Sequence, residues 1–453
     1  MSRVERLNFG SRLGVVLATA GSAVGLGNVW RFPFMTGHNG GAAFILIYLG
    51  CILLLGIPGM ISEFIVGRHS GANAARSYRR LAGGKPWAVI GYMGVFTSML
   101  ILGFYAVVAG WCLQYLFASL SEQLQGDKEF VSHYFASFSS DPLKPAFWAV
   151  VFVFVTHVVV SRGIRDGIEK ASKLLMPLLF LLLVVIVVAS CMLPGAGKGI
   201  EFLFRPDFSK LSTGVFLEAL GQAFFSLSLG TACLCTYASY FGRNTNLAGT
   251  AVQIAVVDTL IAVLAGLMIF PAAFSVGVNP DAGPSLIFIT LPNVFQQAFA
   301  DVPALGYVVS VMFYSLMSLA ALTSTISMHE IGTAFFHEEL RLSRRGGAAI
   351  VTAVCSVMAV LCSLSFGACP GINIAGKSLM DCFDNLTAQV LMPLSAFLTC
   401  LFVGWYVPRK VVSDELSNRG GINAWYTSMF IYAVKIICPA GILAIFLHQF
   451  NLI

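Results

Sequence analysis

Residues able to bind ions and small polar molecules interrupt two of the longest apolar stretches of this chain. The first reads GSAVGLGNVWRFP over 21–33 and combines three glycines with Asn28 and Arg31. The second reads GQAFFSLSLGTA over 221–232 and combines a glutamine, three hydroxyl side chains and a glycine at 230. Where a helix unwinds, freed carbonyls can hold a cation and freed N–H groups can hold a carboxylate. Glycines four residues apart also let plain helices pack closely, but the polar residues on both stretches favour interruption.

The composition requires a membrane around these stretches. Of the 453 residues, 57% are hydrophobic and only 11% are charged, against about 25% charged in soluble domains. Residues 174–193 contain no charge and are long enough to cross a hydrocarbon core of about 30 Å. We therefore expect an all-α integral membrane protein. The sequence shows no nucleophile–base pair and no metal-binding cluster, so we do not expect an enzyme.

Hydropathy predicts eleven membrane-spanning helices. Their expected ranges are 12–35, 41–67, 88–119, 146–161, 174–193, 214–241, 247–277, 303–335, 348–366, 383–406 and 425–449. Residues 284–300 are too short to span and should form an outer helix. Nineteen of the 27 lysines and arginines fall on the side of the N-terminus and seven on the other, with Lys435 inside the last span. The positive-inside rule then places the N-terminus in the cytoplasm and the C-terminus outside.

The two interrupted spans occupy matching places in two halves of five spans each. The first half covers about 12–193 and the second about 214–406, with the eleventh helix at 425–449. Unpaired backbone groups cost several kcal/mol each in lipid, so both interruptions must lie inside protein or beside an aqueous cavity. This arrangement predicts an inverted repeat with its binding site where the interruptions meet.

Four long motifs resemble the neurotransmitter:sodium symporter family, and they occur in the family's order. GSAVGLGNVWRFP followed by NGGAAFILIY resembles its first span and loop, and RGIRDGIEKASKLLMP (162–177) its fourth inner loop and fifth span. GQAFFSLSLG…TYASY (221–240) resembles its sixth span, and LAALTSTIS (319–327) its eighth. The resemblance, from about Arg6 to about Phe446, implies a LeuT-type 5+5 inverted repeat with helices 1 and 6 broken. This family is itself the best-known example of that architecture, so the predicted repeat and the resemblance are not independent lines of evidence.

The resemblance implies two sodium sites built from oxygen atoms, the ligands that hard cations prefer. At the first site it assigns the Ala23 carbonyl, the side chains of Asn28, Ser226 and Asp258, and the substrate carboxylate. At the second it assigns the carbonyls of Gly21, Val24 and Ala320 and the hydroxyls of Thr323 and Ser324. Without the resemblance, those two hydroxyls would be expected to bond back to their own helix.

Asp258 departs from the family pattern. Members often carry a neutral asparagine there, and those that need chloride place the anion close by. A chloride-independent member carries a glutamate one helical turn later, where this chain has Ala262. A carboxylate inside a membrane span is a functional candidate by default. Its charge would offset that of sodium, so we expect transport without chloride.

Gly25 points to the chemistry of the substrate. Amine transporters of the family place an aspartate there for the substrate ammonium, whereas a glycine leaves room for a substrate that brings its own carboxylate. The resemblance assigns that carboxylate to the N–H groups of Leu26 and Gly27 and the Tyr105 hydroxyl, and the ammonium to the carbonyls of Ala23, Phe225 and Ser226 and the Ser228 hydroxyl. It assigns the side-chain pocket to Ile101, Tyr105, Phe225, Ser228, Thr231 and Met328. Ile101, Phe225 and Met328, each taken alone, would otherwise be expected to pack in the core.

Two gates follow from the same resemblance. Arg31 and Asp384 are expected to pair on the outer side, under an aromatic lid of Tyr105 and Phe225. Arg6 and Glu338 are expected to pair on the inner side, supported by Phe9, Ser239 and Tyr240. Exposed pairs are worth about 0–1 kcal/mol, which suits gates that must open.

Three further features are expected to support the breaks. Glu63 should accept hydrogen bonds from N–H groups that the breaks free, and Gln222 lies at mid-depth of the sixth span. Gly167 and Pro177 frame the inner end of the fifth span. The proline removes a backbone donor, so this end could unwind and admit water to the second sodium site.

The sequence therefore predicts a sodium-coupled symporter for hydrophobic neutral amino acids, aliphatic or aromatic, that works by alternating access. Its expected setting is the bacterial inner membrane, as a monomer or homodimer, with two sodium ions as its only cofactors and no nucleic-acid partner. Two alternatives stay open: a sodium-coupled carrier for another small solute, such as a betaine or amine, and an amino-acid sensor that binds but does not cycle.

Overall fold

The computed structural model describes residues 9–277, 286–369 and 371–449, and helices dominate it. The helices before residue 212 are α1 (Arg12–Ala23), η1 (Gly27–Arg31), α2 (Phe32–His38), α3 (Ala42–Cys51), η2 (Ile52–Gly56), α4 (Ile57–Ser70), α5 (Ala74–Ala82), α6 (Ala88–Leu120), α7 (Lys128–Ser140), α8 (Lys144–Ser161), η3 (Ile164–Glu169), α9 (Lys170–Cys191), α10 (Ala196–Phe204) and η4 (Phe208–Lys210). Those after it are α11 (Thr213–Ser226), α12 (Cys233–Ala238), α13 (Leu247–Ser275), η5 (Leu286–Thr290), α14 (Leu291–Ala298), α15 (Pro303–Glu339), α16 (Arg344–Ser363), η6 (Leu364–Ala368), α17 (Leu379–Asn385), η7 (Leu386–Leu391), α18 (Met392–Leu401), η8 (Phe402–Tyr406), α19 (Arg409–Leu416), α20 (Thr427–Tyr432), η9 (Ala433–Ile437) and α21 (Cys438–Gln449). Strands β1 (Asn373–Ile374) and β2 (Lys377–Ser378) form a short antiparallel hairpin with Asn373 opposite Ser378.

Nine continuous helices in the described residues are long and apolar enough to cross a membrane. They are Ala42–Ser70, Ala88–Leu120, Lys144–Ser161, Ile164–Cys191, Leu247–Ser275, Pro303–Glu339, Arg344–Ala368, Leu379–Tyr406 and Thr427–His448. The pair α1 and α2 makes a tenth span if counted as one broken helix. The sixth span is split into pieces of 14 and 6 residues, neither long enough to cross alone, so the total of eleven stays a prediction.

The first span is broken between α1 and η1. Ser11 starts α1 by accepting a hydrogen bond from the Gly14 N–H (3.0 Å), as N-cap serines do. The helix ends at Ala23, and Val24 is extended (ψ 115°). The segment from Gly27 to His38 then leaves at 54° to α1. The glycine-rich stretch thus interrupts the helix where the sequence places the break.

The sixth span is broken over the six residues between α11 and α12. Three residues in this break have a positive φ: Ser228 (53°), Gly230 (80°) and Ala232 (61°). L-residues seldom adopt this region, so the surroundings must hold it in place. Gly230 shows how close they are, because a Cβ added there would lie 2.1 Å from the Met392 carbonyl oxygen.

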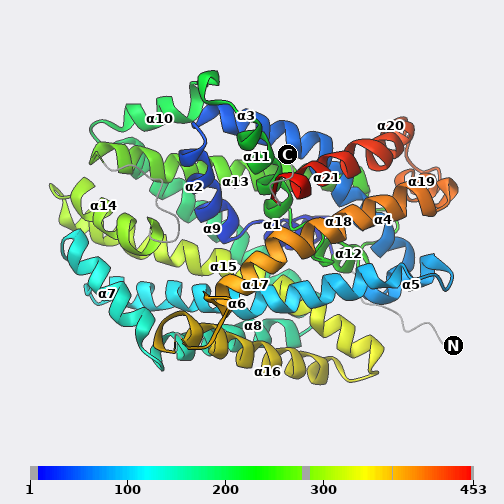
Figure 1. The fold of residues 1–453 in the computed structure, drawn as a ribbon, viewed down its shortest axis with the longest axis horizontal. Helices are drawn as coiled ribbons and strands as arrows, with labels where there is room; N and C mark the ends of the chain where they lie inside the picture. Colours follow the sequence, from blue (N-terminus) through cyan, green and yellow to red (C-terminus); the bar gives the residue numbers. More distant parts are fainter. Residues whose placement is uncertain (1–8, 278–285, 370, 450–453) are drawn as a thin grey trace.

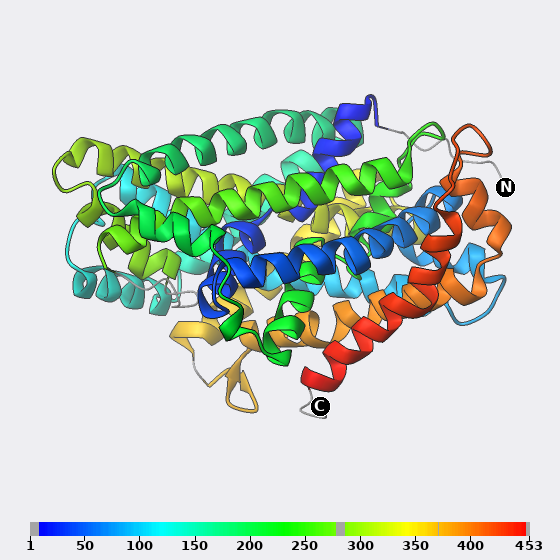
Figure 2. The same cartoon turned by 90° about the horizontal axis from the view of Figure 1, so that it is seen from above.

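The long helices run side by side between two ends of the molecule (Figure 1). Helices α7, α10 and α14 lie at one end, and α5 and α19 lie at the opposite end. The view from above shows the same direction of the long helices and places the C-terminal helix, red, at the edge of the bundle (Figure 2).

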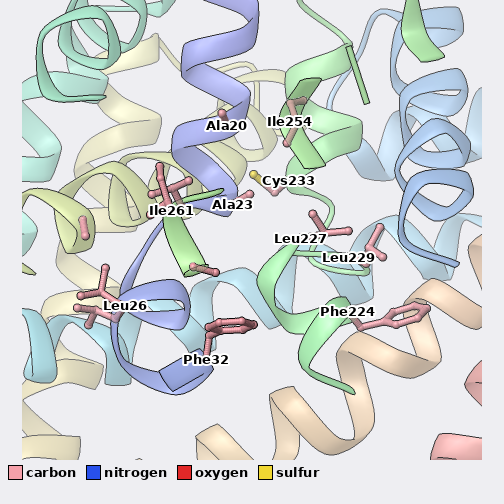
Figure 3. Close-up of a cluster of buried hydrophobic side chains, with 14 of the residues drawn as sticks. Ala20, Ala23, Leu26, Phe32, Phe224, Leu227, Leu229, Cys233, Ile254 and Ile261 are labelled. Carbon is pink, nitrogen blue, oxygen red and sulfur yellow. The ribbon is translucent and has the colours of Figure 1, made fainter. Parts of the chain in front are cut away.

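One apolar cluster surrounds both breaks (Figure 3). Ala23 and Leu26 flank the first break, Leu227 and Leu229 lie within the second, and Ile261 comes from α13. All five side chains are buried. The unwound backbone is therefore enclosed in protein, as its unpaired groups require.

Candidate functional site

The two breaks are joined to each other by hydrogen bonds. Ser228 Oγ, in the second break, donates to the Ser22 carbonyl near the end of α1 (3.1 Å). The Gln222 side chain donates to the Gly27 carbonyl beyond the first break (3.5 Å). The polar groups of both stretches therefore converge at one place.

A first oxygen-rich cluster forms where α13 meets both breaks. Asn28 Nδ2 donates to Asp258 Oδ1 (2.7 Å), while Ser226 Oγ (2.8 Å) and the Tyr48 hydroxyl (3.3 Å) donate to Asp258 Oδ2. The Asp258 side chain is fully buried, and no ion pair in the described part of the chain involves it. A buried carboxylate normally has a charged partner. Carboxylate and hydroxyl oxygens without a basic partner fit a hard cation such as sodium, while the Asn28 amide oxygen accepts from the Gly25 N–H (3.0 Å).

A second cluster joins α15 to the end of α1. Thr323 Oγ1 donates to the Val24 carbonyl (3.1 Å) and lies 2.9 Å from the Ala320 carbonyl oxygen, and Ser324 Oγ lies 3.3 Å from the same Val24 oxygen. Thr323 bonds back to its own helix but also reaches the first span. Gly21 lies opposite, since a Cβ there would be 3.5 Å from Thr323 Cβ. Carbonyls and hydroxyls so gathered again fit sodium.

A cavity between the breaks, α6 and α15 collects the predicted substrate residues. It is lined by Ser22, Ala23, Gly25, Gly27, Ile101, Phe104, Tyr105, Phe225, Ser226, Ser228, Thr231, Cys233, Ser324, Ser327, Met328 and Met392. Ten of the eleven residues predicted for the substrate are among them. The eleventh, Leu26, donates its N–H to the Tyr105 hydroxyl (3.1 Å) at the edge of the cavity.

Gly25 is the tightest point of this lining. A Cβ added there would lie 2.2 Å from Ser324 Oγ and 3.1 Å from the Tyr105 hydroxyl. An aspartate, or any other side chain, could enter only by displacing Ser324. Beside Gly25, the Tyr105 hydroxyl accepts from the Leu26 N–H and keeps its own proton for a ligand.

Several lining residues were not predicted for the substrate. The sequence could have indicated Ser22 and Ser327, because each carries a hydroxyl and lies next to a predicted ligand or one helical turn from one. Phe104 and Cys233 resemble ordinary core residues in the sequence. Met392 comes from α18, and only the tertiary structure brings that helix to the cavity.

On the outer side, Arg31 stacks on the aromatic lid. Its guanidinium carbon lies 4.3 Å from the centre of the Phe225 ring, a cation–π contact. Among the described residues, no ion pair joins Arg31 to Asp384. The two charges nevertheless lie close enough to interact electrostatically, so the outer gate stays a prediction.

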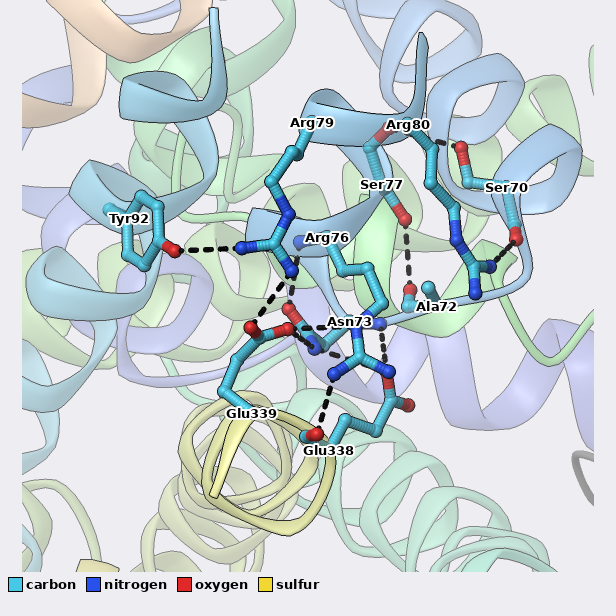
Figure 4. Close-up of polar contacts among 10 residues, drawn as sticks. All are labelled: Ser70, Ala72, Asn73, Arg76, Ser77, Arg79, Arg80, Tyr92, Glu338 and Glu339. Atoms are coloured by element: carbon cyan, nitrogen blue, oxygen red, sulfur yellow. Dashed lines mark hydrogen bonds and ion pairs between the residues drawn. The ribbon is translucent and has the colours of Figure 1, made fainter. Parts of the chain in front are cut away.

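On the inner side, Arg6 lies outside the described residues, and Glu338 contacts α5 (Figure 4). Glu338 Oε2 accepts from the backbone N–H (2.9 Å) and the side chain (3.0 Å) of Asn73. Its neighbour Glu339 pairs with Arg76 (2.9 Å) and Arg79 (3.0 Å). These contacts fix the inner end of α15 to α5.

Tyr240, predicted for the inner gate, links the first span to α15. Its hydroxyl donates to Glu330 Oε1 (2.6 Å), and Glu330 also pairs with Arg344. The Phe9 N–H donates to the Tyr240 carbonyl (3.2 Å), and the Phe9 ring meets Tyr237 and Tyr240 edge-on. The start of the first span, α12 and α15 are thereby held together.

Two predicted supports lie at the breaks. Glu63 Oε1 accepts from the Gly230 N–H (2.7 Å) and Oε2 from the Cys235 N–H (3.3 Å), so its carboxylate bridges the second break. Gln222 is fully buried, and its Oε1 has no hydrogen-bond partner among the described residues.

The inner end of the fifth span is irregular and tied to α1. Residues Ile164–Glu169 form a π-helix, and a Cβ on Gly167 would lie 2.1 Å from the Val159 carbonyl oxygen. Pro177 lies inside α9. Glu169 accepts from the Gly10 N–H (2.7 Å) and from Ser11 Oγ (2.9 Å).

Fold and site together define a multi-pass membrane transporter with two broken helices at its centre. The sequence profile of the Sodium:neurotransmitter symporter family matches residues 6–138 and 140–453. The chain belongs to this family and is a sodium-dependent symporter.

Similar proteins agree with that assignment. A sodium-dependent transporter of Bacillus subtilis is 36% identical over 460 residues, covering 100% of both chains. One of Haemophilus influenzae is 35% identical and covers 98% of both. The crystal structure of MhsT in complex with L-phenylalanine superimposes with a TM-score of 0.88 at 42% identity, covering 98% of this chain and 99% of that one.

Proposed function

We propose that this protein couples the entry of two sodium ions to the uptake of a hydrophobic neutral amino acid, without a requirement for chloride. It would do so by alternating access of one central site between the halves 12–193 and 214–406. Uptake would run into the cell across the cytoplasmic membrane, with the N-terminus inside.

The geometry around Gly25 carries this proposal. Backbone and hydroxyl groups converge where an amine transporter would need an acidic side chain, and no side chain fits there. The Tyr105 hydroxyl accepts from the Leu26 N–H and can still donate its own proton to a ligand. A ligand that brings its own carboxylate, as an α-amino acid does, satisfies these donors.

The rest of the cavity supports a hydrophobic side chain. Ile101, Phe104, Phe225, Met328 and Met392 contribute apolar surface to its wall. No arginine, lysine or carboxylate lines it within the described residues, so a charged side chain would be buried without a partner. The similar protein MhsT is described in complex with L-phenylalanine, which fits the same class.

Two oxygen-rich clusters support two sodium ions. Asn28, Ser226 and Asp258 would hold one beside the substrate carboxylate, and Val24, Ala320, Thr323 and Ser324, with Gly21, the other. With a membrane potential of about 100 mV and a tenfold gradient, each ion supplies about 3.7 kcal/mol, so two could concentrate a zwitterion about 10⁵-fold. The Asp258 carboxylate would supply the negative charge that chloride supplies elsewhere.

Uptake into proteoliposomes tests the proposal. We expect an inward sodium gradient to drive accumulation of labelled leucine or phenylalanine, choline in place of sodium to abolish it, and gluconate in place of chloride to leave it intact. Sodium-dependent uptake of a betaine or amine that hydrophobic amino acids do not inhibit would contradict the substrate class. Amino-acid binding without counterflow exchange would instead indicate a sensor.

A further inference from the structure

The inner end of the cavity is polar, although the walls that lead to it are apolar. Ser22 from α1, Thr231 from the second break, Cys233 from α12 and Ser327 from α15 line it, and we call these four residues the inner polar cluster. Each is 2–4% exposed. Nothing in the sodium sites or in the recognition of a carboxylate accounts for them.

This cluster lies at the end of the cavity opposite the donors for a carboxylate. Tyr105 marks the carboxylate end on α6, and Ser98, two turns earlier, donates to the Thr231 carbonyl (2.6 Å). On α15, Ser324 marks the carboxylate end, and Ser327 lies one turn further. The cluster is thus roughly 5–10 Å from the carboxylate end, where the tip of an aromatic side chain would lie.

The hydroxyl protons of the cluster are already used. Ser22 donates to the carbonyl three residues earlier (2.6 Å), Thr231 to the carbonyl three residues earlier (2.8 Å), and Ser327 to the carbonyl four residues earlier (3.1 Å). With the Ser327 proton on the Thr323 carbonyl, the tyrosine is the donor of the 2.9 Å contact between Ser327 and the Tyr237 hydroxyl. Thr231 Oγ1 also accepts from the Cys233 N–H (3.3 Å), so Thr231 and Ser327 each keep one lone pair for a ligand, and the Cys233 thiol is only a weak donor.

We propose that the side-chain end of this site selects aromatic amino acids whose ring carries a hydrogen-bond donor, a phenol or an indole, with Thr231 and Ser327 as the residues that determine the preference. This rests on the proposed function and deepens it. A phenol O–H or indole N–H finds an acceptor at the cluster, whereas the edge of a phenyl ring leaves those lone pairs unused. Because each hydroxyl is already bonded to backbone, the preference is a moderate one.

Equilibrium binding with a matched ligand series tests the inference. We expect sodium-dependent binding of L-tyrosine to be roughly three- to tenfold tighter than that of L-phenylalanine, the value of one net hydrogen bond. 4-Amino-L-phenylalanine, which has a ring donor, should also exceed phenylalanine. 4-Fluoro-L-phenylalanine, which has no donor, should not.

Two variants separate the proposed residues from general damage. In Thr231→Val and in Ser327→Ala, we expect the ratio of tyrosine to phenylalanine affinity to fall towards one. Ser315→Ala is the control, because Ser315 lies on the same helix and bonds back to it (2.7 Å) but does not line the cavity. It should keep the wild-type ratio. In Ser327→Ala, the Tyr237 hydroxyl loses its partner and becomes free to accept from the ligand in place of Ser327. Thr231→Val leaves the contact between Tyr237 and Ser327 in place, so it tests the cluster without that replacement.

The outcomes are distinct. Phenylalanine binding as tightly as tyrosine, or an unchanged ratio in both variants, would overturn the inference and leave the proposed function standing. If no neutral amino acid bound in the presence of sodium, the proposed function itself would fall, and this inference with it.

Discussion

Replacing Asp258 with asparagine would remove one negative charge from the first oxygen-rich cluster and keep the shape of the side chain. In the native protein, the carboxylate accepts from Asn28 (2.7 Å), Ser226 (2.8 Å) and Tyr48 (3.3 Å). An asparagine NH₂ cannot accept, so at least one of these donors would face another donor. Loss of one member of a buried charge pair costs about 2–5 kcal/mol, or about 30-fold to several thousand-fold in sodium affinity.

Chloride should raise the sodium affinity of the Asp258→Asn variant but not that of the wild type. A chloride ion beside the neutral asparagine can replace the missing charge, so we expect chloride to recover part of the sodium affinity of Asp258→Asn. Sodium titrations of substrate binding to purified protein, carried out in chloride and in gluconate, measure both effects.

The control is Asp381→Asn, which makes the same chemical change on α17, away from the cluster. It should leave the sodium affinity unchanged in both salts. If Asp258→Asn bound sodium within about threefold of wild type in gluconate, against the 30-fold loss expected for a buried charge, Asp258 would not be a sodium ligand. Wild-type binding that failed in gluconate would refute the chloride independence.

Three further predictions concern single residues. Gly25→Ala places a Cβ 2.2 Å from Ser324 Oγ, so we expect uptake to fall at least about fivefold, as overpacking of 1–3 kcal/mol predicts, whereas Gly221→Ala, whose Cβ meets nothing within 4 Å, should transport normally. Glu63→Gln turns one of two bonds to the second break into a donor–donor contact, so the midpoint of thermal unfolding in detergent should fall, and an unchanged midpoint would contradict the role of Glu63. Burial acts to raise the pKa of Glu415, but its contacts with a neighbouring histidine and with Arg68 outweigh burial and hold the pKa below its usual range. The folded pKa is depressed, so this stabilisation is present above the unfolded value of about 4.3 and is lost as pH falls through the lower folded value. The difference in thermal stability between wild type and Glu415→Gln should then not shrink from pH 8 to 5 and should shrink only below about pH 4; a difference that shrank already between pH 7 and 5 would argue against it.

The sequence was sufficient to predict most of the membrane-spanning helices and most of the residues that line the cavity. The apolar runs predicted the spans because length and hydropathy are properties of a single segment. Gly25, Gly27 and the hydroxyls of 221–232 predicted the breaks because an unpaired backbone needs glycine and polar neighbours. The resemblance then placed residues of distant segments in one cavity.

The contacts that close the two sides could not be read in the same way. Arg31 lies over the Phe225 ring, and Glu338 accepts hydrogen bonds from Asn73, the N-cap of α5. Each of these contacts depends on how closely two separate helices approach one another. No pattern within one segment encodes that approach, because it follows from packing along the whole length of several helices.

By itself, the sequence determined that this chain lies in a membrane and where its helices break. Those properties follow from the cost of leaving backbone and charge unpaired in lipid, which each segment must meet by its own composition. Only the tertiary structure decided that Ser22, Thr231, Cys233 and Ser327 share one end of the cavity and that the protons of the three hydroxyls point to backbone carbonyls. The reason is geometric: the side chains come from separate elements, and the direction of a hydroxyl proton depends on the acceptor that folding places beside it.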